Sequence, residues 1–378
     1  MSSNAAVATK VQTRVPFLDL QQQYANLKAE LAPAIAGALE RAAYIDGPAV
    51  KEFEADFARY CDTSECVALD SGTAALHLTF LALGIGPGDE VIVPTNTFIA
   101  SAAAVAMAGA TVVPIDSDSK TWLMDLNQVE AKITSRTKAV LAVHLYGQPL
   151  RMDPLQDICD RKGVYLVEDA AQAHGGRYKG RRIGSLGEVS CFSFYPAKNL
   201  GAYGDGGAIT TNDSTLAERV RRLANHGRVN KYEHGELGWN FRMDEIQGVV
   251  LRHKLAYLDA WNQRRRELAL QYHMRLTDLP VRMYEVPAEC EATYHLMVVC
   301  VDDPQSLAKH LAGFGIETGF HYPIPVHLQS AFKSLGFSAG DFPIAEEICQ
   351  QAISLPIFPE MTDEQLTWVC EAIDNHLA

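Results

Sequence analysis

The feature of this sequence that most constrains its fold is a repeated alternation of helical stretches with short apolar runs. Helical patterns occupy residues 73–83, 99–108 and 154–162. Short runs typical of strands cover residues 90–94, 111–115, 139–144, 164–168, 189–194 and 207–211. Buried strands separated by helices indicate a mostly parallel sheet with helices on both faces. The first part of the chain is therefore predicted to form an α/β domain.

The pattern changes near residue 245. Residues 245–277 form one long, charged helical pattern, and residues 280–378 contain a smaller set of α/β elements. We therefore predict a large domain over residues 15–245. A connecting helix and a small C-terminal domain are predicted over residues 246–378.

Composition excludes several classes of protein. The chain of 378 residues is 48% hydrophobic and has a net charge of −13, which predicts a globular protein that binds neither nucleic acid nor an anionic membrane. Its eight cysteines form no CxxC pair, so we predict reduced thiols, no disulfide framework and no metal site. The N-terminal segment lacks the apolar stretch of a signal peptide. We expect a cytoplasmic location.

Lys198 stands in a loop that follows an apolar run and is rich in small residues. A lone lysine in a loop is by default exposed, but aromatic and apolar neighbours favour burial here. A buried lysine loses proton affinity and becomes a nucleophilic amine that can condense with an aldehyde. The glycines of this loop are expected to let the backbone approach a ligand closely; they are Gly201, Gly204, Gly206 and Gly207.

Asp169 and Gln172 follow the apolar run 164–168. Ligands of α/β sheets bind beyond the carboxyl ends of the strands. An aspartate at that position can hold a protonated ring nitrogen, although taken alone it is also typical of a helix N-cap. Glu168 is expected to be structural, because strand alternation points it to the opposite face.

Ser71, Gly72 and Thr73 lie between a short apolar run and a predicted helix. Free backbone amides at a helix start bind anions, and hydroxyl groups add donors. Simple helix capping by Ser71 or Thr73 explains the same pattern. Together with Lys198 and Asp169, however, this turn indicates a ligand with a phosphate, an aldehyde and a pyridine ring. Pyridoxal 5'-phosphate carries all three groups.

At these motifs the sequence resembles the DegT/DnrJ/EryC1/StrS aminotransferases, pyridoxal phosphate enzymes that act on nucleotide-linked keto sugars. The resemblance extends from Val15 to the C-terminal helix. It is carried by the segments Ser71-Gly-Thr, Glu168-Asp-Ala-Ala-Gln-Ala-His-Gly and Phe192-Ser-Phe-Tyr-Pro-Ala-Lys. It implies fold type I, in which a large domain with a mostly parallel seven-stranded sheet is joined to a smaller C-terminal α/β domain.

The resemblance also implies roles for single residues. Lys198 would bind the cofactor covalently and then carry protons, and Asp169 would pair with the pyridinium nitrogen. Gln172 would lie near the ring hydroxyl. Ser193 would bind the phosphate beside the amides of Gly72 and Thr73, and Phe98 would stack on the ring, although such a phenylalanine is otherwise more often a core residue.

Two further segments match the family. Asn240 lies in the segment that crosses to the neighbouring subunit, so it would reach the partner's phosphate in a homodimer with shared active sites. Read without the family, Asn240 is a turn residue. His321, Tyr322 and His327 belong to a substrate-side loop of the small domain, where His327 could approach the sugar. Without the resemblance both histidines would be considered structural.

The implied reaction moves the amino group of L-glutamate to a keto carbon of a nucleotide-linked 6-deoxy sugar. The segments at 204–207 and 319–329 look most like those of members that aminate C-3 of dTDP-3-keto-6-deoxyhexoses. Amination at C-4, as in perosamine synthases, and a branch that resembles aminohydroxybenzoate synthases stay open. Dehydration of the sugar is a further open alternative. Relatives that catalyse dehydration carry a histidine in place of the lysine, so Lys198 favours transamination. A regulatory module that retained the fold would not need Lys198 or Asp169.

Overall fold

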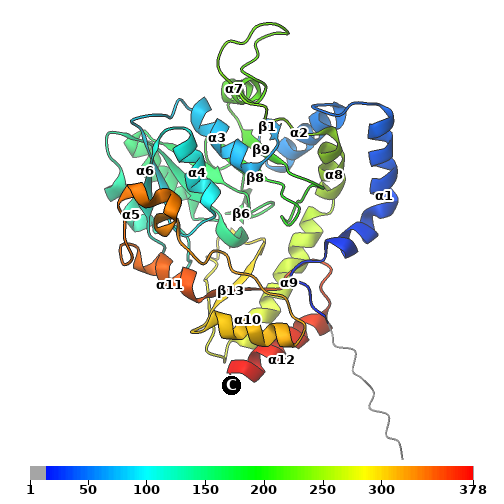
Figure 1. The fold of residues 1–378 in the computed structure, drawn as a ribbon, viewed down its shortest axis with the longest axis vertical. Coiled ribbons are helices and arrows are strands. Elements are labelled where there is room, and N and C mark those ends of the chain that lie inside the picture. The colour runs from blue at the N-terminus through cyan, green and yellow to red at the C-terminus, as the bar shows by residue number, and fades with distance from the viewer. Residues whose placement is uncertain (1–13, 378) are drawn as a thin grey trace, which may run out of the picture.

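The computed structural model describes residues 14–377 and contains a seven-stranded sheet at the centre of the large domain (Figure 1). The strand order is β1-β9-β8-β5-β4-β2-β3, and only β9 runs antiparallel to its neighbours. The predicted mostly parallel seven-stranded sheet is thus confirmed. The strands are β1 (Glu65–Leu69), β2 (Glu90–Pro94), β3 (Thr111–Ile115), β4 (Thr137–Val143), β5 (Tyr165–Asp169), β8 (Val189–Ser193) and β9 (Gly207–Thr211).

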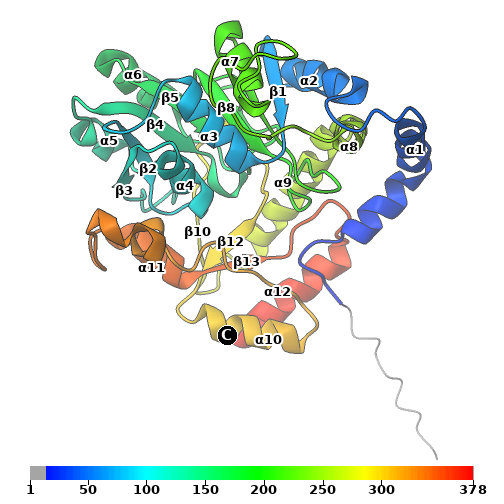
Figure 2. The ribbon, with the colours of Figure 1, turned by 45° about the horizontal axis from the view of Figure 1, so that its top comes forward.

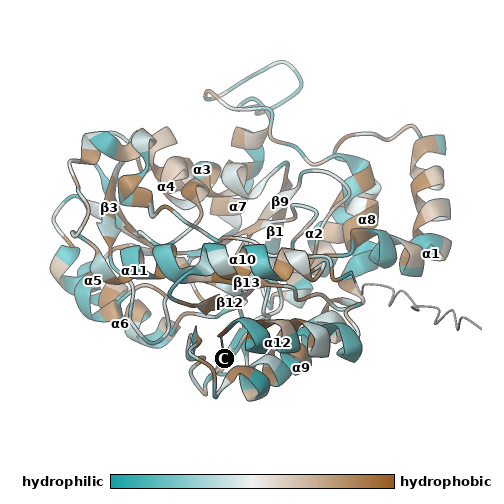
Figure 3. Cartoon of the chain, turned by 60° about the horizontal axis from the view of Figure 1, so that its bottom comes forward, coloured by the Kyte–Doolittle hydropathy of each residue, from teal (hydrophilic) through white to brown (hydrophobic). Residues whose placement is uncertain are grey.

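Helices cover both faces of this sheet (Figure 3). On one face α3 (Gly72–Ala82) packs against α4 (Ile99–Met107) and α7 (Ser214–Ala224). On the other, α5 (Leu126–Lys132) packs against α6 (Met152–Lys162), which contacts β5. α3 is apolar around most of its circumference because it lies between the sheet and two neighbouring helices. The helices predicted from residues 73, 99 and 154 are present with boundaries shifted by one or two residues.

The prediction of one continuous helix over residues 245–277 is wrong. The chain forms α8 (Glu245–Leu255) and α9 (Leu258–Leu276), with a turn at residues 256–257. The turn contains a hydrogen bond from the Tyr257 amide to the Lys254 carbonyl. Because of this turn, α8 and α9 pack against different parts of the molecule. α8 packs on α2 (Pro48–Tyr60) and on α1 (Leu20–Glu40), the helix at the edge of the molecule in Figure 1.

α9 leads into a smaller α/β unit around the antiparallel sheet β10-β12-β13 (Figure 2). Leu268 and Tyr272 of α9 share its apolar core with Ile353 and, from the start of the described chain, Val15. The division into residues 15–245 and 246–378 stays a prediction. The elements are β10 (Arg282–Met283), β12 (Met297–Cys300), α10 (Pro304–Gly313), α11 (Pro343–Gln351), β13 (Ala352–Leu355) and α12 (Asp363–Leu377).

Short elements join the two units. β6 (Arg177–Tyr178) pairs with β7 (Arg181–Arg182) and with β11 (Cys290–Glu291), so the large domain and the chain entering the small one share a three-stranded sheet. The described residues also contain the short 3-10 turns η1 (Leu145–Gly147), η2 (Val326–Leu328) and η3 (Ser330–Leu335).

Membrane-spanning helices and targeting segments concern the chain as a whole. Within residues 14–377, no helix has the length and apolar character required to cross a membrane. Residues 1–13, to which most of the signal-peptide prediction applies, lie outside the described part.

Candidate active site

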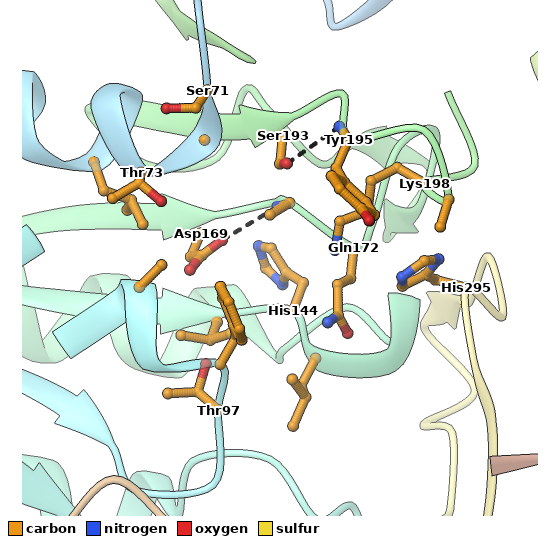
Figure 4. A pocket seen from close by; sticks show the side chains of 18 of the residues that line it. Ser71, Thr73, Thr97, His144, Asp169, Gln172, Ser193, Tyr195, Lys198 and His295 are labelled. Atoms are coloured by element: carbon orange, nitrogen blue, oxygen red, sulfur yellow. Dashed lines mark hydrogen bonds between the residues drawn. The ribbon is translucent and has the colours of Figure 1, made fainter. Parts of the chain in front are cut away.

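A cavity of about 510 Å³ opens at the carboxyl ends of β1, β4, β5 and β8, on the side that faces the small domain (Figure 4). Parallel strands bring their carboxyl ends to one edge of the sheet, so residues far apart in the sequence meet there. Residues predicted for the site that line this cavity are Gly72, Thr73, Phe98, Asp169, Gln172, Ser193, Lys198, His321 and Tyr322.

Asp169 is the last residue of β5 and its side chain is buried at the base of the cavity. The Ser101 hydroxyl donates to Oδ2 at 2.7 Å and the Ala171 amide donates to Oδ1 at 3.2 Å. Burial raises the pKa of Asp169 above its ordinary value, although these two bonds and the positive charge of Lys198 oppose the rise. A buried carboxylate of this kind gains from a cation placed against it.

Glu168 points to the other face of β5, as strand alternation predicts. It is fully buried, and it accepts hydrogen bonds from the His144 Nε2 at 3.0 Å, from the Ser190 hydroxyl and from the Leu186 amide at 2.9 Å. Burial alone would raise the pKa of Glu168, but the bonds from His144 and Ser190 bring it below its ordinary value. Glu168 is therefore a charged structural residue beside the site.

His144 follows β4 and lines the cavity between Asp169 and Gln172 (Figure 4). Its Nδ1 accepts a hydrogen bond from the Leu150 amide at 3.0 Å. The ring proton therefore sits on Nε2, where it is donated to Glu168. The ring is held as the neutral tautomer in a fixed orientation.

Lys198 lies across the cavity from Asp169 (Figure 4). Burial lowers the pKa of the Lys198 amine to about 8, although the negative charge of Asp169 opposes this fall. The amine is therefore a better nucleophile near neutral pH than an exposed lysine, as its sequence context predicts.

The glycines of the lysine loop have a different purpose from the one predicted. A Cβ on Gly201 would lie 2.2 Å from the Pro196 carbonyl oxygen, and one on Gly207 would lie 2.2 Å from the Ser71 carbonyl carbon. Both glycines allow the loop to pack against the backbone of this chain rather than against a ligand. A Cβ on Gly204 would contact the Gln247 side chain, and Gly206 alone of the four lines the cavity.

The start of α3 lies beside Ser193 at the cavity and is suited to an anion. The amides of Gly72 and Thr73 lie in the first turn, where no intrahelical acceptor exists, whereas the Ser71 hydroxyl caps the Ala74 amide at 3.1 Å. A Cβ on Gly72 would lie 2.6 Å from the Cβ of Ser193. The structure thus brings together the residues predicted to hold a phosphate, and Ser71 is engaged as a cap.

Gln172 connects the large domain with the small one. Its Oε1 accepts from the Tyr146 amide at 2.6 Å and its Nε2 donates to the Tyr322 hydroxyl at 3.1 Å. The Tyr322 ring lies 5.3 Å from that of Phe98, which is 49% exposed at the start of α4. Phe98 is therefore an exposed ring at the edge of the cavity rather than the core residue that is more common for phenylalanine.

Two histidines of the small domain face Lys198. The Nδ1 of His321 lies 2.8 Å from the Ser354 hydroxyl, and burial together with the charge of Lys198 lowers the pKa of His321 to about 4. His295 also lines the cavity and lies beside Lys198 in Figure 4. His321 was predicted to lie at the site, whereas sequence reasoning missed His295.

His327 and Asn240 do not line this cavity. His327 is buried, with Nδ1 2.9 Å from the Thr95 hydroxyl and Nε2 3.1 Å from a Glu346 oxygen. Both of its ring nitrogens are thus engaged within the chain, and this placement contradicts the predicted approach to the sugar. Asn240 is exposed, and its Oδ1 accepts from Arg242.

Three residues that sequence reasoning missed shape the site: Ser101, His144 and His295. His144 directly follows a predicted strand, so the rule that led to Asp169 could have found it. Ser101 lies inside α4 and His295 follows β11 in another unit, so no local pattern marks them.

Pyridoxal phosphate fits the donors and acceptors of this cavity. Asp169 is a buried acid suited to a protonated ring nitrogen, and Phe98 is an exposed aromatic side chain that lines the same cavity. Gly72 lies so close to Ser193 that an added Cβ would overlap the serine. Because residue 72 has no side chain, the free amides at the start of α3 stay accessible to an anion. Together with the nucleophilic Lys198, the fold and the site define a pyridoxal phosphate-dependent enzyme.

Comparisons with known proteins agree with this class. The model of the DegT/DnrJ/EryC1/StrS aminotransferase family matches residues 25–374. The chain belongs to this family; it is an aminotransferase of fold type I, and pyridoxal phosphate is its cofactor.

Similar proteins include two curated transaminases. The dTDP-3-amino-3,4,6-trideoxy-alpha-D-glucose transaminase of Streptomyces venezuelae is 48% identical and the alignment covers 95% of each chain. The dTDP-3-amino-3,6-dideoxy-alpha-D-galactopyranose transaminase of Aneurinibacillus thermoaerophilus is 45% identical over 96% of this chain and 99% of its own. The crystal structure of S. venezuelae DesV in complex with a ketimine intermediate superposes with a TM-score of 0.94 at 48% identity, over 96% of this chain and 98% of that chain.

The contact between Gly72 and Ser193 predicts the effect of one added methyl group. In the Gly72→Ala variant the new Cβ would overlap Ser193, so the anion site must widen, and we expect cofactor affinity to fall about 10-fold or more. Spectroscopic titration of the cofactor-free protein with pyridoxal phosphate measures this. Gly313→Ala is the control, because a Cβ there meets no atom within 4 Å. Equal affinities of Gly72→Ala and the native protein would contradict the assignment of the anion site.

Proposed function

We propose that this enzyme transfers the amino group of L-glutamate to C-3 of a dTDP-linked 3-keto-6-deoxyhexose. The observation that carries the proposal is that the Lys198 amine and the Asp169 carboxylate face one cavity next to a helix start suited to phosphate. The choice of C-3 is supported by the two curated relatives, both of which are transaminases of dTDP-3-amino sugars.

The chain's own residues divide the work of holding the cofactor. Asp169 would hold the pyridinium nitrogen in its protonated form, and Phe98 would stack on the ring. Gln172 would face the ring hydroxyl, and Ser193 with the Gly72 and Thr73 amides would hold the phosphate. When bound, pyridoxal phosphate supplies the aldehyde that accepts an amino group and the ring that withdraws the electron pair.

Lys198 is the proton carrier of both half-reactions. In the first, its Nζ removes the α-proton of L-glutamate. The amino group passes to the cofactor and water supplies the keto oxygen, so the carbon skeleton leaves as 2-oxoglutarate. In the second, Nζ supplies and removes protons at the sugar carbon that receives the amine. The lowered pKa supports this role, because an amine with a pKa of about 8 populates both protonation states near neutral pH. His321 and Tyr322 contact the sugar from the small domain.

We further propose a homodimer in which Asn240 reaches the phosphate site of the partner subunit. Asn240 is exposed and lies outside the cavity of its own chain. The preceding loop projects from the body of the molecule near α7 (Figure 1) and exposes large apolar side chains, among them Tyr232 at 84% and Leu237 at 91%. Exposed apolar side chains on a projecting loop support contact with another chain.

A cytoplasmic location is part of the same proposal. All eight cysteines are free and buried within the described residues. This supports folding in a reducing compartment.

A panel of keto sugars tests the proposed substrate. The enzyme is incubated with L-glutamate and 3-keto or 4-keto sugars linked to dTDP, UDP or GDP, and the products are analysed by mass and by NMR for the position of the amine. We expect a 3-amino product from the dTDP-linked 3-keto sugar, and no product from Lys198→Ala. A 4-amino product would establish C-4 amination instead, and loss of a hydroxyl without gain of nitrogen would establish the dehydratase alternative.

The Asp169→Asn variant tests the role of the buried acid. Asparagine has nearly the same shape but cannot carry the negative charge that keeps the ring nitrogen protonated, so we expect amino transfer to slow by about 100-fold or more. Stopped-flow absorption with L-glutamate measures the rate, and circular dichroism checks the fold. A variant that keeps the native rate would show that the ion pair is not needed.

Mixed dimers test whether the active sites are shared. Lys198→Ala and Asn240→Ala chains are each expected to be defective. After random 1:1 mixing, half of the dimers would be mixed and each would hold one intact site, so about a quarter of native activity should return. The control is Lys198→Ala mixed with itself. Failure of the mixture to recover activity, with mixed dimers demonstrated by mass spectrometry, would contradict sharing.

A further inference from the structure

His295 is a cavity residue that the proposed function does not use. It follows β11, it is 9% exposed, and it lies beside Lys198 (Figure 4). The proton on its ring can be located from the surrounding hydrogen bonds.

The series of hydrogen bonds that orients His295 starts at a backbone carbonyl. Asn262 Nδ2 donates to the His174 carbonyl at 2.8 Å, so Asn262 Oδ1 is free to accept from Asn199 Nδ2 at 2.8 Å. Asn199 Nδ2 also donates to the Thr293 carbonyl at 3.0 Å. The Asn199 amide is therefore oriented with Oδ1 toward His295.

His295 Nδ1 lies 3.2 Å from Asn199 Oδ1. A carbonyl oxygen can only accept, so Nδ1 carries the proton. Burial holds the pKa of His295 well below its ordinary value, and the positive charges of Lys198 and Arg265 lower it further. The ring is therefore neutral, and Nε2 has a free lone pair.

The backbone that carries this ring is fixed by Arg265, which is buried. Arg265 Nη1 donates to the Tyr294 carbonyl at 3.1 Å, to the His295 carbonyl at 3.4 Å and to the Ile357 carbonyl at 2.8 Å. His295 Nε2 makes no hydrogen bond within residues 14–377. The ring thus presents a rigid acceptor to the cavity.

The titratable and charged groups that face His295 are Lys198, Arg265, His321 and His174. Among these groups, Lys198 lies on a loop that lines the cavity and has a long flexible side chain. Its Nζ can therefore turn toward the His295 ring. The two side chains are not hydrogen-bonded in this arrangement, in which Lys198 also faces Asp169.

We propose that His295 is a positioning residue whose Nε2 accepts a hydrogen bond from Lys198 when that amine is free, and so aims the amine's lone pair at the carbon that loses its proton. No proton passes to His295, because a neutral ring in this cavity is too weak a base. The inference rests on the proposed function, since it requires Lys198 to be the proton carrier.

Two variants distinguish the contributions of the two ring nitrogens of His295. His295→Asn keeps an amide near the position of Nδ1 and removes the acceptor at Nε2, whereas His295→Gln places an amide oxygen near Nε2. The readout is the pKa of Lys198 in the pyridoxamine phosphate form of the holoenzyme, in which the lysine is free. It is obtained from the pH dependence of reductive methylation of Lys198, followed by peptide mass spectrometry.

We expect His295→Asn to lower the pKa of Lys198 by about half a unit to one unit, because an acceptor stabilises the ammonium form. The kcat of the glutamate half-reaction should fall about 10-fold with little change in KM, since the amine is misaligned but glutamate still binds. His295→Gln should bring both the Lys198 pKa and the kcat most of the way back to their native values. An unchanged Lys198 pKa in His295→Asn, or equal losses in both variants, would overturn the proposal.

A measurement on the native protein does not depend on the folding of a variant. With ¹⁵N-histidine labelling, His295 should show a protonated Nδ1 and an unprotonated Nε2 whose resonance moves upfield when L-glutamate frees Lys198. A protonated Nε2, or no movement, would also overturn the proposal. Borohydride reduction that fails to fix the cofactor on Lys198 would instead contradict the proposed function itself.

Discussion

The buried carboxylate of Glu168 is the interaction on which the geometry of the site depends. A charge without contact with solvent costs several kcal/mol unless hydrogen bonds compensate it. Here the donors come from His144 after β4, from Ser190 near the start of β8 and from the 186–187 turn that precedes β8, so the acid ties β5 to both neighbouring strands. Because alternate residues face opposite sides of a strand, fixing Glu168 also fixes Asp169 on the cavity side.

The site itself is complete only when the two units meet. The Tyr322 hydroxyl accepts from Gln172, and the Tyr146 hydroxyl donates to the His321 carbonyl at 3.0 Å. These bonds hold a loop of the small domain over residues that belong to the large one. The small domain therefore contributes polar groups to the cavity.

Local signals explain what could be predicted from the sequence. The strands of the large sheet are short, apolar and separated by helices, and Asp169, Lys198 and Gly72 lie in contiguous motifs. The break at residues 256–257 contains neither proline nor glycine, so helical periodicity continues through it. His295 and His327 depend on partners distant in the sequence, Asn199 and Glu346. No local pattern distinguishes the cavity histidine from the structural one.

The surroundings of Lys198 also explain why its pKa stops near 8. Burial weakens the ammonium form, and a charged histidine beside it would weaken it further, but burial keeps the pKa of both His295 and His321 below neutral. The opposing charge is that of Asp169. A proton carrier must take up and release a proton with similar ease, which requires a pKa close to the working pH. Neutral histidines on one side and a single buried acid on the other provide that balance without a further ion pair.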